Sequence, residues 1–203
     1  MLDAGCGAGA VFLCLAARIA GLQLTGLDVD PEVLALAAEN ARSNDLDVAL
    51  FERDVTNVDV ETLGGRQFDH VVANPPFWSS DQARESPDES RRRANIMAPD
   101  MLEKWIAACG RLLKHRGQMS LILPAERFDV ALAASVRHLG SISILPVWPK
   151  AGMPARRVIL QAIKGGRSPA RLFSGLVLHD DTGGYSAAAQ AVLTDAVSVW
   201  DIG

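Results

Sequence analysis

The chain has 203 residues, of which 49% are hydrophobic and 22% charged, as in an ordinary globular protein. Its longest uninterrupted apolar run, residues 10–17, is far shorter than the roughly 20 residues of a membrane-spanning helix, so we expect no membrane span. The three cysteines and four histidines are scattered along the sequence. This distribution excludes a disulfide framework, predicts no metal site and indicates a reducing, cytoplasmic setting.

The net charge of −4 is unevenly divided along the chain. Residues 1–80 carry 4 basic and 12 acidic side chains (balance −8), whereas residues 81–203 carry 16 basic and 12 acidic ones (balance +4). No acidic residue lies between Asp129 and Asp180, an interval that contains seven basic residues. This pattern favours contact with a polyanion. A core-rich segment whose few charges happen to be basic explains the composition equally well.

Short β-type runs alternate with helical patterns over the first two thirds of the chain. We expect strands at 1–2, 23–28, 48–52, 68–73 and 119–123, and helices at 11–20, 31–43, 100–114 and 125–139. Strand and helix repeated in this order predict a parallel sheet with helices on both faces. The polar stretch 79–95 predicts a mobile loop.

The last third of the chain breaks this alternation. Residues 142–147 and 158–163 are both β-type, and the ten residues between them contain two prolines and a glycine. Because this connection is too short for a parallel crossover, the two strands should pair antiparallel. A further β-type run at 175–179 and a helix at 187–200 follow. We therefore expect a Rossmann-like α/β fold whose seven-stranded, mostly parallel sheet ends in a reversed strand. One domain spans 1–203, with 165–203 as a tail packed on it.

A glycine-rich turn follows the first strand, with the sequence Asp3-Ala4-Gly5-Cys6-Gly7-Ala8-Gly9. Glycines let the backbone turn sharply and let a ligand lie against bare peptide groups, which predicts an adenosine-containing cofactor. A purely structural turn stays an alternative. Asp28 ends the second strand, where an acid can accept both ribose hydroxyls, as in NAD and S-adenosylmethionine enzymes. It can also be an ordinary surface aspartate, and Asp30 is better placed to cap the next helix.

The segment Asn74-Pro75-Pro76-Phe77 follows the fourth strand, at the edge of the sheet where ligands of such folds bind. Two prolines fix the backbone, so the Asn74 side-chain carbonyl and the Pro75 backbone carbonyl can point at one target. Two fixed acceptors suit a planar amino group with two hydrogens to donate, and Phe77 can stack on that group. A rigid turn is the alternative. Asp54, after the third strand, can hold an adenine amino group or can simply be solvated.

These motifs together resemble the class I S-adenosylmethionine-dependent methyltransferases, among which the Asn-Pro-Pro-aromatic box marks enzymes that methylate amino nitrogens. Residues 146–152, 155–158, 164–167 and 175–179 are similar to the bacterial group that includes the tRNA1(Val) adenine-N6 methyltransferase. The resemblance implies S-adenosyl-L-methionine as cofactor and an RNA substrate, with adenine N6 of tRNA favoured. Guanine N2 of rRNA and a protein glutamine amide stay open. So do two other classes, an NAD-dependent oxidoreductase and a non-catalytic RNA-binding module. Members of this group have a few dozen residues before the glycine turn, so we expect the natural protein to be longer.

The resemblance also implies three sets of site residues. The catalytic set is the box: Asn74, Pro75, Pro76 and Phe77. The cofactor set comprises Asp3, Gly5, Cys6, Gly7, Gly9, Asp28, Val29, Asp54, Val55 and Asn74. The RNA-binding set comprises Arg91, Arg92, Arg93, Lys150, Arg156 and Arg157, although these basic residues can also be no more than solvated charges.

Overall fold

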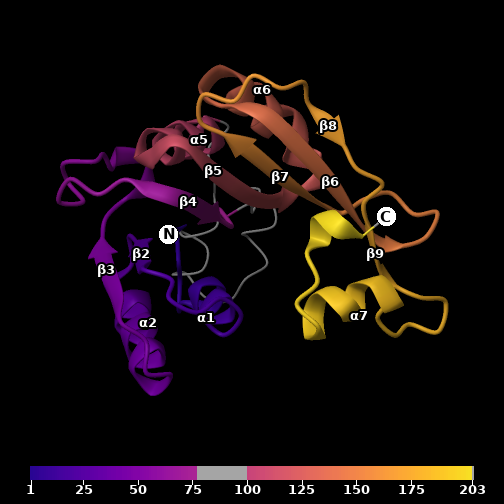
Figure 1. Ribbon diagram of the computed structural model, residues 1–203, viewed down its shortest axis with the longest axis horizontal. Helices are drawn as coiled ribbons and strands as arrows, with labels where there is room; N and C mark the ends of the chain where they lie inside the picture. Colours follow the sequence, from indigo (N-terminus) through magenta and orange to yellow (C-terminus); the bar gives the residue numbers. More distant parts are fainter. Residues whose placement is uncertain (77–99, 203) are drawn as a thin grey trace, which may run out of the picture.

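A single twisted sheet organises the part of the chain that the computed structural model describes, residues 1–76 and 100–202 (Figure 1). Nine strands form it within these residues, and their bounds in chain order are β1 (Leu2–Ala4), β2 (Leu24–Asp28), β3 (Val48–Glu52), β4 (Phe68–Ala73), β5 (Leu113–Pro124), β6 (Gly140–Lys150), β7 (Arg157–Ile163), β8 (Arg171–Leu172) and β9 (Leu176–His179). The order across the sheet is β3-β2-β1-β4-β5-β7-β6-β8, and β9 also pairs with β6.

Strands β1 to β5 are parallel to one another, whereas β7 lies antiparallel between β5 and β6. The expected fold class and the antiparallel pairing of the two late strands are therefore confirmed. Two short strands extend the expected seven-stranded sheet, since β8 and β9 both pair in parallel with β6. The expected run at 175–179 corresponds to β9, and β8 was not anticipated.

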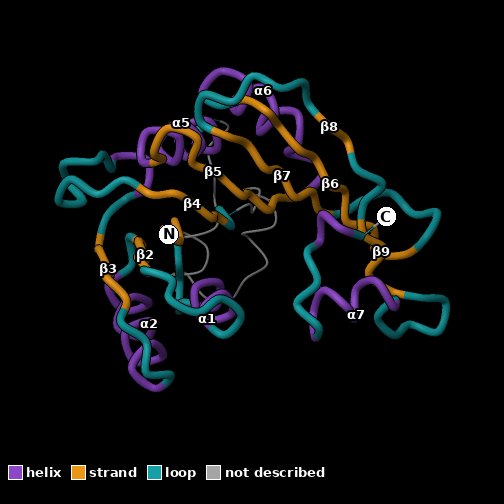
Figure 2. The backbone as a smooth tube through the Cα atoms, viewed as in Figure 1, coloured by secondary structure: helices purple, strands orange, loops and turns teal. Residues whose placement is uncertain are grey.

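Helices cover both faces of the sheet, as expected (Figures 1 and 2). Those described are α1 (Ala10–Ala16), α2 (Pro31–Ser43), α5 (Met101–Leu112), α6 (Phe128–His138) and α7 (Ala187–Thr194), with 3₁₀ turns η1 (Val55–Asn57), η2 (Ala125–Arg127) and η3 (Val199–Asp201). The strand alternation divides the core between the faces. Ile144 belongs to the cluster beneath α5 and α6, whereas its neighbour Leu145 belongs to the cluster beneath α7.

Three element boundaries differ from expectation by four residues or more. Strand β5 begins at Leu113 rather than 119, since Leu113 pairs with Phe68 of β4 and the regular pairing resumes at Gln118 after an irregular stretch. The Lys164 ammonium donates to the Leu113 carbonyl, 2.6 Å away, and so helps to end α5 there. Helix α7 ends at Thr194 rather than 200, because Ala196 adopts a left-handed φ of 55°. Helix α1 ends at Ala16 rather than 20, ahead of a turn at Gly21 (φ 74°).

Within the described residues, no helix has the length and apolar character that crossing a membrane requires. The predicted single-domain organisation stays a prediction.

Candidate active site

Three of the expected site segments meet at the carboxyl edge of the parallel strands. Ala4, the last residue of β1, is in register with Leu27 on one side and with Ala73 on the other. The next residues along the three strands are Gly5, Asp28 and Asn74. They therefore stand side by side, about 4.8 Å apart from strand to strand. This is the edge at which α/β folds bind ligands.

The glycine turn is fixed by backbone geometry that only glycine adopts readily. Gly5, Gly7 and Gly9 have φ angles of 72°, 52° and 91°. A β-carbon at Gly5 would lie 2.5 Å from the Trp105 ring, and one at Gly9 would lie 2.2 Å from the Phe12 ring. The two aromatic rings therefore pack directly against bare backbone, which gives these glycines a structural role as well as access for a ligand.

Asp28 faces this turn and holds it. Its carboxylate accepts hydrogen bonds from the backbone N–H of Gly7 (2.8 Å) and of Asp30 (3.1 Å), one on each oxygen. A carboxylate oxygen has a second lone pair, so each can still accept a hydroxyl hydrogen. Val29, the next residue, is 66% exposed and offers an apolar contact beside the carboxylate. Asp30 caps α2 by accepting from the Glu32 and Val33 amides, as expected.

Asp3 lies within β1 rather than in the turn, and its side chain is only 1% exposed. Its Oδ2 has no hydrogen-bond partner among the described residues. Burial, together with the nearby charge of Asp28, raises the pKa of this carboxyl to about 7. A buried acceptor without a partner and a second carboxylate close by suit a ligand that brings a cationic group to Asp3 and hydroxyls to Asp28.

Cys6 contributes packing rather than reactivity. Its side chain is 6% exposed, and burial raises the pKa of its thiol to about 12, so the thiol is protonated at neutral pH. A β-carbon at Gly26 would lie 2.9 Å from its sulfur, which shows how closely Cys6 packs on β2. A ligand contact by Cys6 therefore involves its backbone.

Asp54 and Val55 are held by local structure. The Asp54 carboxylate caps η1, accepting from the Thr56 backbone N–H and hydroxyl (both 2.8 Å) and from the Asn57 side-chain amide (3.2 Å). It is exposed, but capping already occupies much of its acceptor capacity. Val55 is 3% exposed and belongs to the main core, so only its backbone is open to a cofactor. Their predicted cofactor contacts stay predictions.

The box begins directly after β4, beside the glycine turn. Asn74 is exposed, Pro75 is buried and Pro76 is half-buried, so the rigid pair of prolines anchors an accessible asparagine. Phe77 lies outside the described residues, as do Arg91, Arg92 and Arg93.

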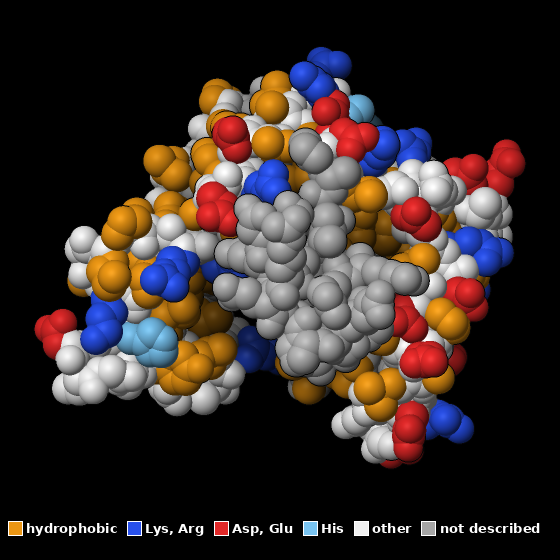
Figure 3. All heavy atoms as spheres, turned by 180° about the vertical axis from the view of Figure 1, so that it is seen from behind, with side chains coloured by type: hydrophobic (Ala, Val, Ile, Leu, Met, Phe, Trp, Pro, Cys, Tyr) orange, Lys and Arg blue, Asp and Glu red, His pale blue; other side chains and the backbone are white. Residues whose placement is uncertain are grey.

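Lys150, Arg156 and Arg157, which we term the edge cluster, are exposed and lie at the same edge of the sheet. Arg157 is in register with Pro124 at the carboxyl end of β5 and with Val147 near the end of β6. The backbone N–H of Arg156 donates to the Val147 carbonyl (3.1 Å), which fixes the loop between β6 and β7. Seen from behind, the described surface mixes basic and acidic side chains, so neither sign of charge dominates its described part (Figure 3).

Sequence reasoning missed the rings that shape the turn. Trp105 lies on the buried face of α5, but nothing local in the sequence shows that its ring reaches Gly5. It also missed Arg18, whose guanidinium donates to the last carbonyls of α7 at Val192 (3.1 Å) and Leu193 (2.8 Å). A contact across 174 residues leaves no local signal.

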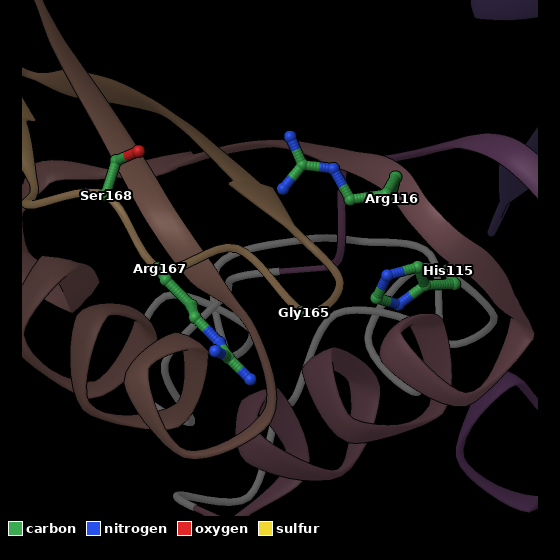
Figure 4. Close-up of a pocket in the computed structure, with 5 residues that line it drawn as sticks. All are labelled: His115, Arg116, Gly165, Arg167 and Ser168. Atoms are coloured by element: carbon green, nitrogen blue, oxygen red, sulfur yellow. The ribbon is translucent and has the colours of Figure 1, made fainter.

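A groove of about 440 Å³ lies at the opposite edge of the sheet, lined by His115, Arg116, Gly165, Arg167 and Ser168 (Figure 4). His115 and Arg116 stand at the start of β5, far from the end that carries the box. The Arg116 and Arg167 side chains point in different directions, so they do not converge on one ligand. We therefore place the candidate active site at the carboxyl edge. No group of three His, Cys, Asp or Glu side chains in the described ranges is arranged to hold a metal ion.

Comparison with known proteins shows the family to which the chain belongs. The profile of the methyltransferase small domain family matches residues 1–128. A tRNA1(Val) (adenine(37)-N6)-methyltransferase from Porphyromonas gingivalis is 31% identical over 195 residues, covering 91% of this chain and 74% of the relative. A protein of the same name from Dickeya chrysanthemi is 28% identical over 205 residues, covering 96% of this chain and 79% of the relative.

Solved structures share the fold. A predicted O-methyltransferase from Agrobacterium tumefaciens superimposes with a TM-score of 0.74 at 24% identity, covering 94% of this chain and 86% of that one. A 16S rRNA N2 methyltransferase of T. thermophilus in complex with AdoMet and guanosine superimposes with a TM-score of 0.57 at 21% identity, covering 80% of this chain and 36% of that one. The alternatives of an NAD-dependent oxidoreductase and of a non-catalytic module are therefore wrong. The chain belongs to the methyltransferase small domain family and shares its fold with S-adenosylmethionine-dependent methyltransferases.

Proposed function

We propose that this enzyme transfers a methyl group to N6 of an adenine in tRNA. The observation that carries the proposal is the register that sets Asn74 beside Gly5, because it brings an amino-group acceptor next to the cofactor turn. The RNA substrate and the N6 position rest on relatives of 28–31% identity that carry the name tRNA1(Val) (adenine(37)-N6)-methyltransferase. An enzyme of tRNA acts where tRNA is found, so we also infer a cytoplasmic location.

Asn74 and Pro75 activate the target by geometry. The Asn74 side-chain carbonyl and the Pro75 backbone carbonyl each accept one N–H of the adenine amino group. Engaging both hydrogens turns the nitrogen lone pair out of conjugation and toward the glycine turn. The bound cofactor supplies an electrophilic methyl group on a sulfonium. A nitrogen–carbon bond would form as the carbon–sulfur bond breaks, leaving S-adenosylhomocysteine, and the methylated nitrogen would release one proton to solvent. Because the step depends on positioning, it requires no strong general base.

Asp3 and Asp28 are fitted to hold the cofactor. The unpartnered Oδ2 of Asp3 suits the ammonium of the methionine moiety, and the free lone pairs of Asp28 suit the ribose hydroxyls. The glycine turn admits the methionine moiety against bare backbone, and Val29 offers an apolar surface to the adenine ring. The edge cluster would hold the RNA backbone while the target base is splayed out of its stack.

The experiment is methylation of bulk tRNA and bulk rRNA with labelled S-adenosylmethionine, followed by mass spectrometry of the nucleosides. The proposal expects N6-methyladenosine from tRNA. Asn74→Ala should lower turnover on the order of 10²–10³-fold, by analogy with the loss of one oxyanion-hole donor. Asn44→Ala, which removes an exposed asparagine at the end of α2, is the matched control and should leave turnover unchanged. Label on guanine N2, or on protein alone, would overturn the substrate assignment. Near-normal transfer by Asn74→Ala would overturn the mechanism.

A further inference from the structure

Tyr185, the single tyrosine of the chain, is exposed in the loop that follows β9. It is 54% exposed, and its ring stacks on the imidazole of His179 with 5.3 Å between centroids and 18° between planes. His179 is itself half-buried as the last residue of β9. The pair therefore has a supported inner ring and an exposed outer one.

The loop that carries Tyr185 is held in place by its own hydrogen bonds. Asp180 Oδ1 accepts from the backbone N–H of Thr182 (2.9 Å), from the Thr182 hydroxyl (2.7 Å) and from the backbone N–H of Gly184 (3.1 Å). His179 and Tyr185 form an antiparallel bridge, and the Ser186 hydroxyl donates to the Val177 carbonyl (2.6 Å). An exposed aromatic ring held this firmly loses little conformational entropy when it binds a ligand.

The position of the pair relates it to the RNA proposed above. His179 is in register with Lys150, a member of the edge cluster and the last residue of β6. Strand β9 is four strand intervals from β4, which carries Asn74, or about 20 Å across the sheet. Strands β9 and β4 both end at the carboxyl edge of the sheet (Figure 1). A nucleotide at Tyr185 would thus be several positions away from a base presented to Asn74.

We propose that Tyr185, backed by His179, is a stacking platform for an unpaired base of the RNA substrate, several positions away from the methylated nucleotide. This inference rests on the proposed function. Flat aromatic rings accept any base by stacking, and neighbouring cations hold the phosphates. Lys150 is such a cation, and the segment 130–179 contains no acid. Of the two acids that follow, Asp180 is engaged in its own turn, whereas Asp181 is exposed.

A purely structural role for Tyr185, closing the turn over His179, makes different predictions for a set of substitutions. Stacking requires an aromatic face, so Tyr185→Phe and Tyr185→Trp should bind tRNA as tightly as the natural enzyme. Tyr185→Leu keeps apolar bulk but has no aromatic face, and Tyr185→Ala has neither. Both should weaken tRNA binding and raise its KM by about 5- to 100-fold. Leu172→Ala, at a residue that is 73% exposed on β8, is the control and should change nothing.

Two measurements separate the possible outcomes. Binding of S-adenosylhomocysteine should be the same in all these variants, because the platform is remote from the glycine turn. Nitration of Tyr185 by tetranitromethane, read by mass spectrometry, reports on this site alone because the chain has one tyrosine. Bound tRNA should protect it. If the enzyme methylates tRNA but bound tRNA does not protect Tyr185 from nitration, or if Tyr185→Leu binds tRNA as tightly as Tyr185→Phe, the platform is refuted. If the natural enzyme neither binds nor methylates tRNA, the proposed function fails first.

Discussion

Replacing Asp3 by asparagine should make the protein more stable and the cofactor site weaker. The carboxyl has a pKa of about 7 instead of 3.8, a change of about three units. Since one unit corresponds to about 1.36 kcal/mol, holding the ionised form in this buried place costs about 4 kcal/mol. Asparagine has nearly the same shape and no charge, so it avoids that cost at every pH.

The pH dependence follows from proton binding. Below pH about 4 the carboxyl is protonated in the folded and unfolded chain alike, so this group costs the natural protein nothing. Between pH 4 and 7 the unfolded chain has released its proton while the folded chain retains it, so stability falls as the pH rises. Above about pH 7 the full cost is present. The free energy of unfolding of Asp3→Asn, relative to the natural protein, should therefore grow by about 4 kcal/mol from pH 4 to 8.

Urea denaturation of both proteins at several pH values measures this difference directly. Other titrating groups are common to both proteins and cancel in the comparison. Near pH 8 the expected difference corresponds to roughly 10 °C in Tm for a chain of this size. Asp47→Asn, which changes an exposed aspartate, is the control and should show a difference that does not vary with pH. An equally flat difference for Asp3→Asn would refute the reasoning.

Asp3→Asn should also weaken ligand binding. It is therefore expected to raise the stability of the fold and to lower the affinity for the cofactor, and few other substitutions would do both. Binding of S-adenosylhomocysteine should tighten about tenfold from pH 6 to 8 in the natural protein, because its ammonium favours the ionised Asp3. In Asp3→Asn the affinity should be lower, and the part of its pH dependence due to this carboxyl should vanish. Calorimetric titration at both pH values gives the comparison. Unchanged affinity would leave Asp3 as a buried carboxyl without a cofactor role.

Two further perturbations probe the turn and the RNA surface. Gly9→Ala should destabilise the fold by at least about 2 kcal/mol, because φ is 91° and the added β-carbon would meet the Phe12 ring at 2.2 Å. Gly64→Ala, at φ 67° with open space around it, should cost less in the same thermal melt. Replacing the whole edge cluster with alanine should reduce the log–log salt dependence of tRNA binding by up to about two units. An unchanged slope would count against this surface.

The parts of the fold that could be predicted from the sequence are those with local signals. The glycine turn, the alternating strands and the short link between β6 and β7 are all visible in a few neighbouring residues, and the structure confirms the mostly parallel sheet and the antiparallel pairing. The capping role of Asp54 also had a local signal that went unused, since an aspartate two residues before Thr56 is typical of such a turn.

The parts that could not be predicted depend on distant segments. The two residues that precede Asp3 gave too short a pattern to show that it is a buried strand residue whose Oδ2 lacks a partner in the described part of the chain. The polar start of β5 resembles a loop, and backbone hydrogen bonds with the distant Lys164 hold it, from Arg116 N–H to the Lys164 carbonyl (3.1 Å) and from Lys164 N–H to the Gly117 carbonyl (2.9 Å). Trp105 reaches Gly5 because α5 packs across the sheet, and Arg18 reaches α7 from 174 residues away.

The acidic and basic residues that the sequence distributes unevenly lie in different regions of the carboxyl edge. The acids proposed to attract a cationic cofactor stand on β1 and β2, whereas the edge cluster proposed to attract RNA stands on β6 and β7. From β1 to β7 is three strand intervals, about 14 Å, which exceeds the Debye length of about 8 Å at physiological ionic strength. The acids therefore do little to repel RNA from the edge cluster. Strand β4 lies between the two regions, so Asn74 stands where a base held from one side can meet a methyl group held from the other.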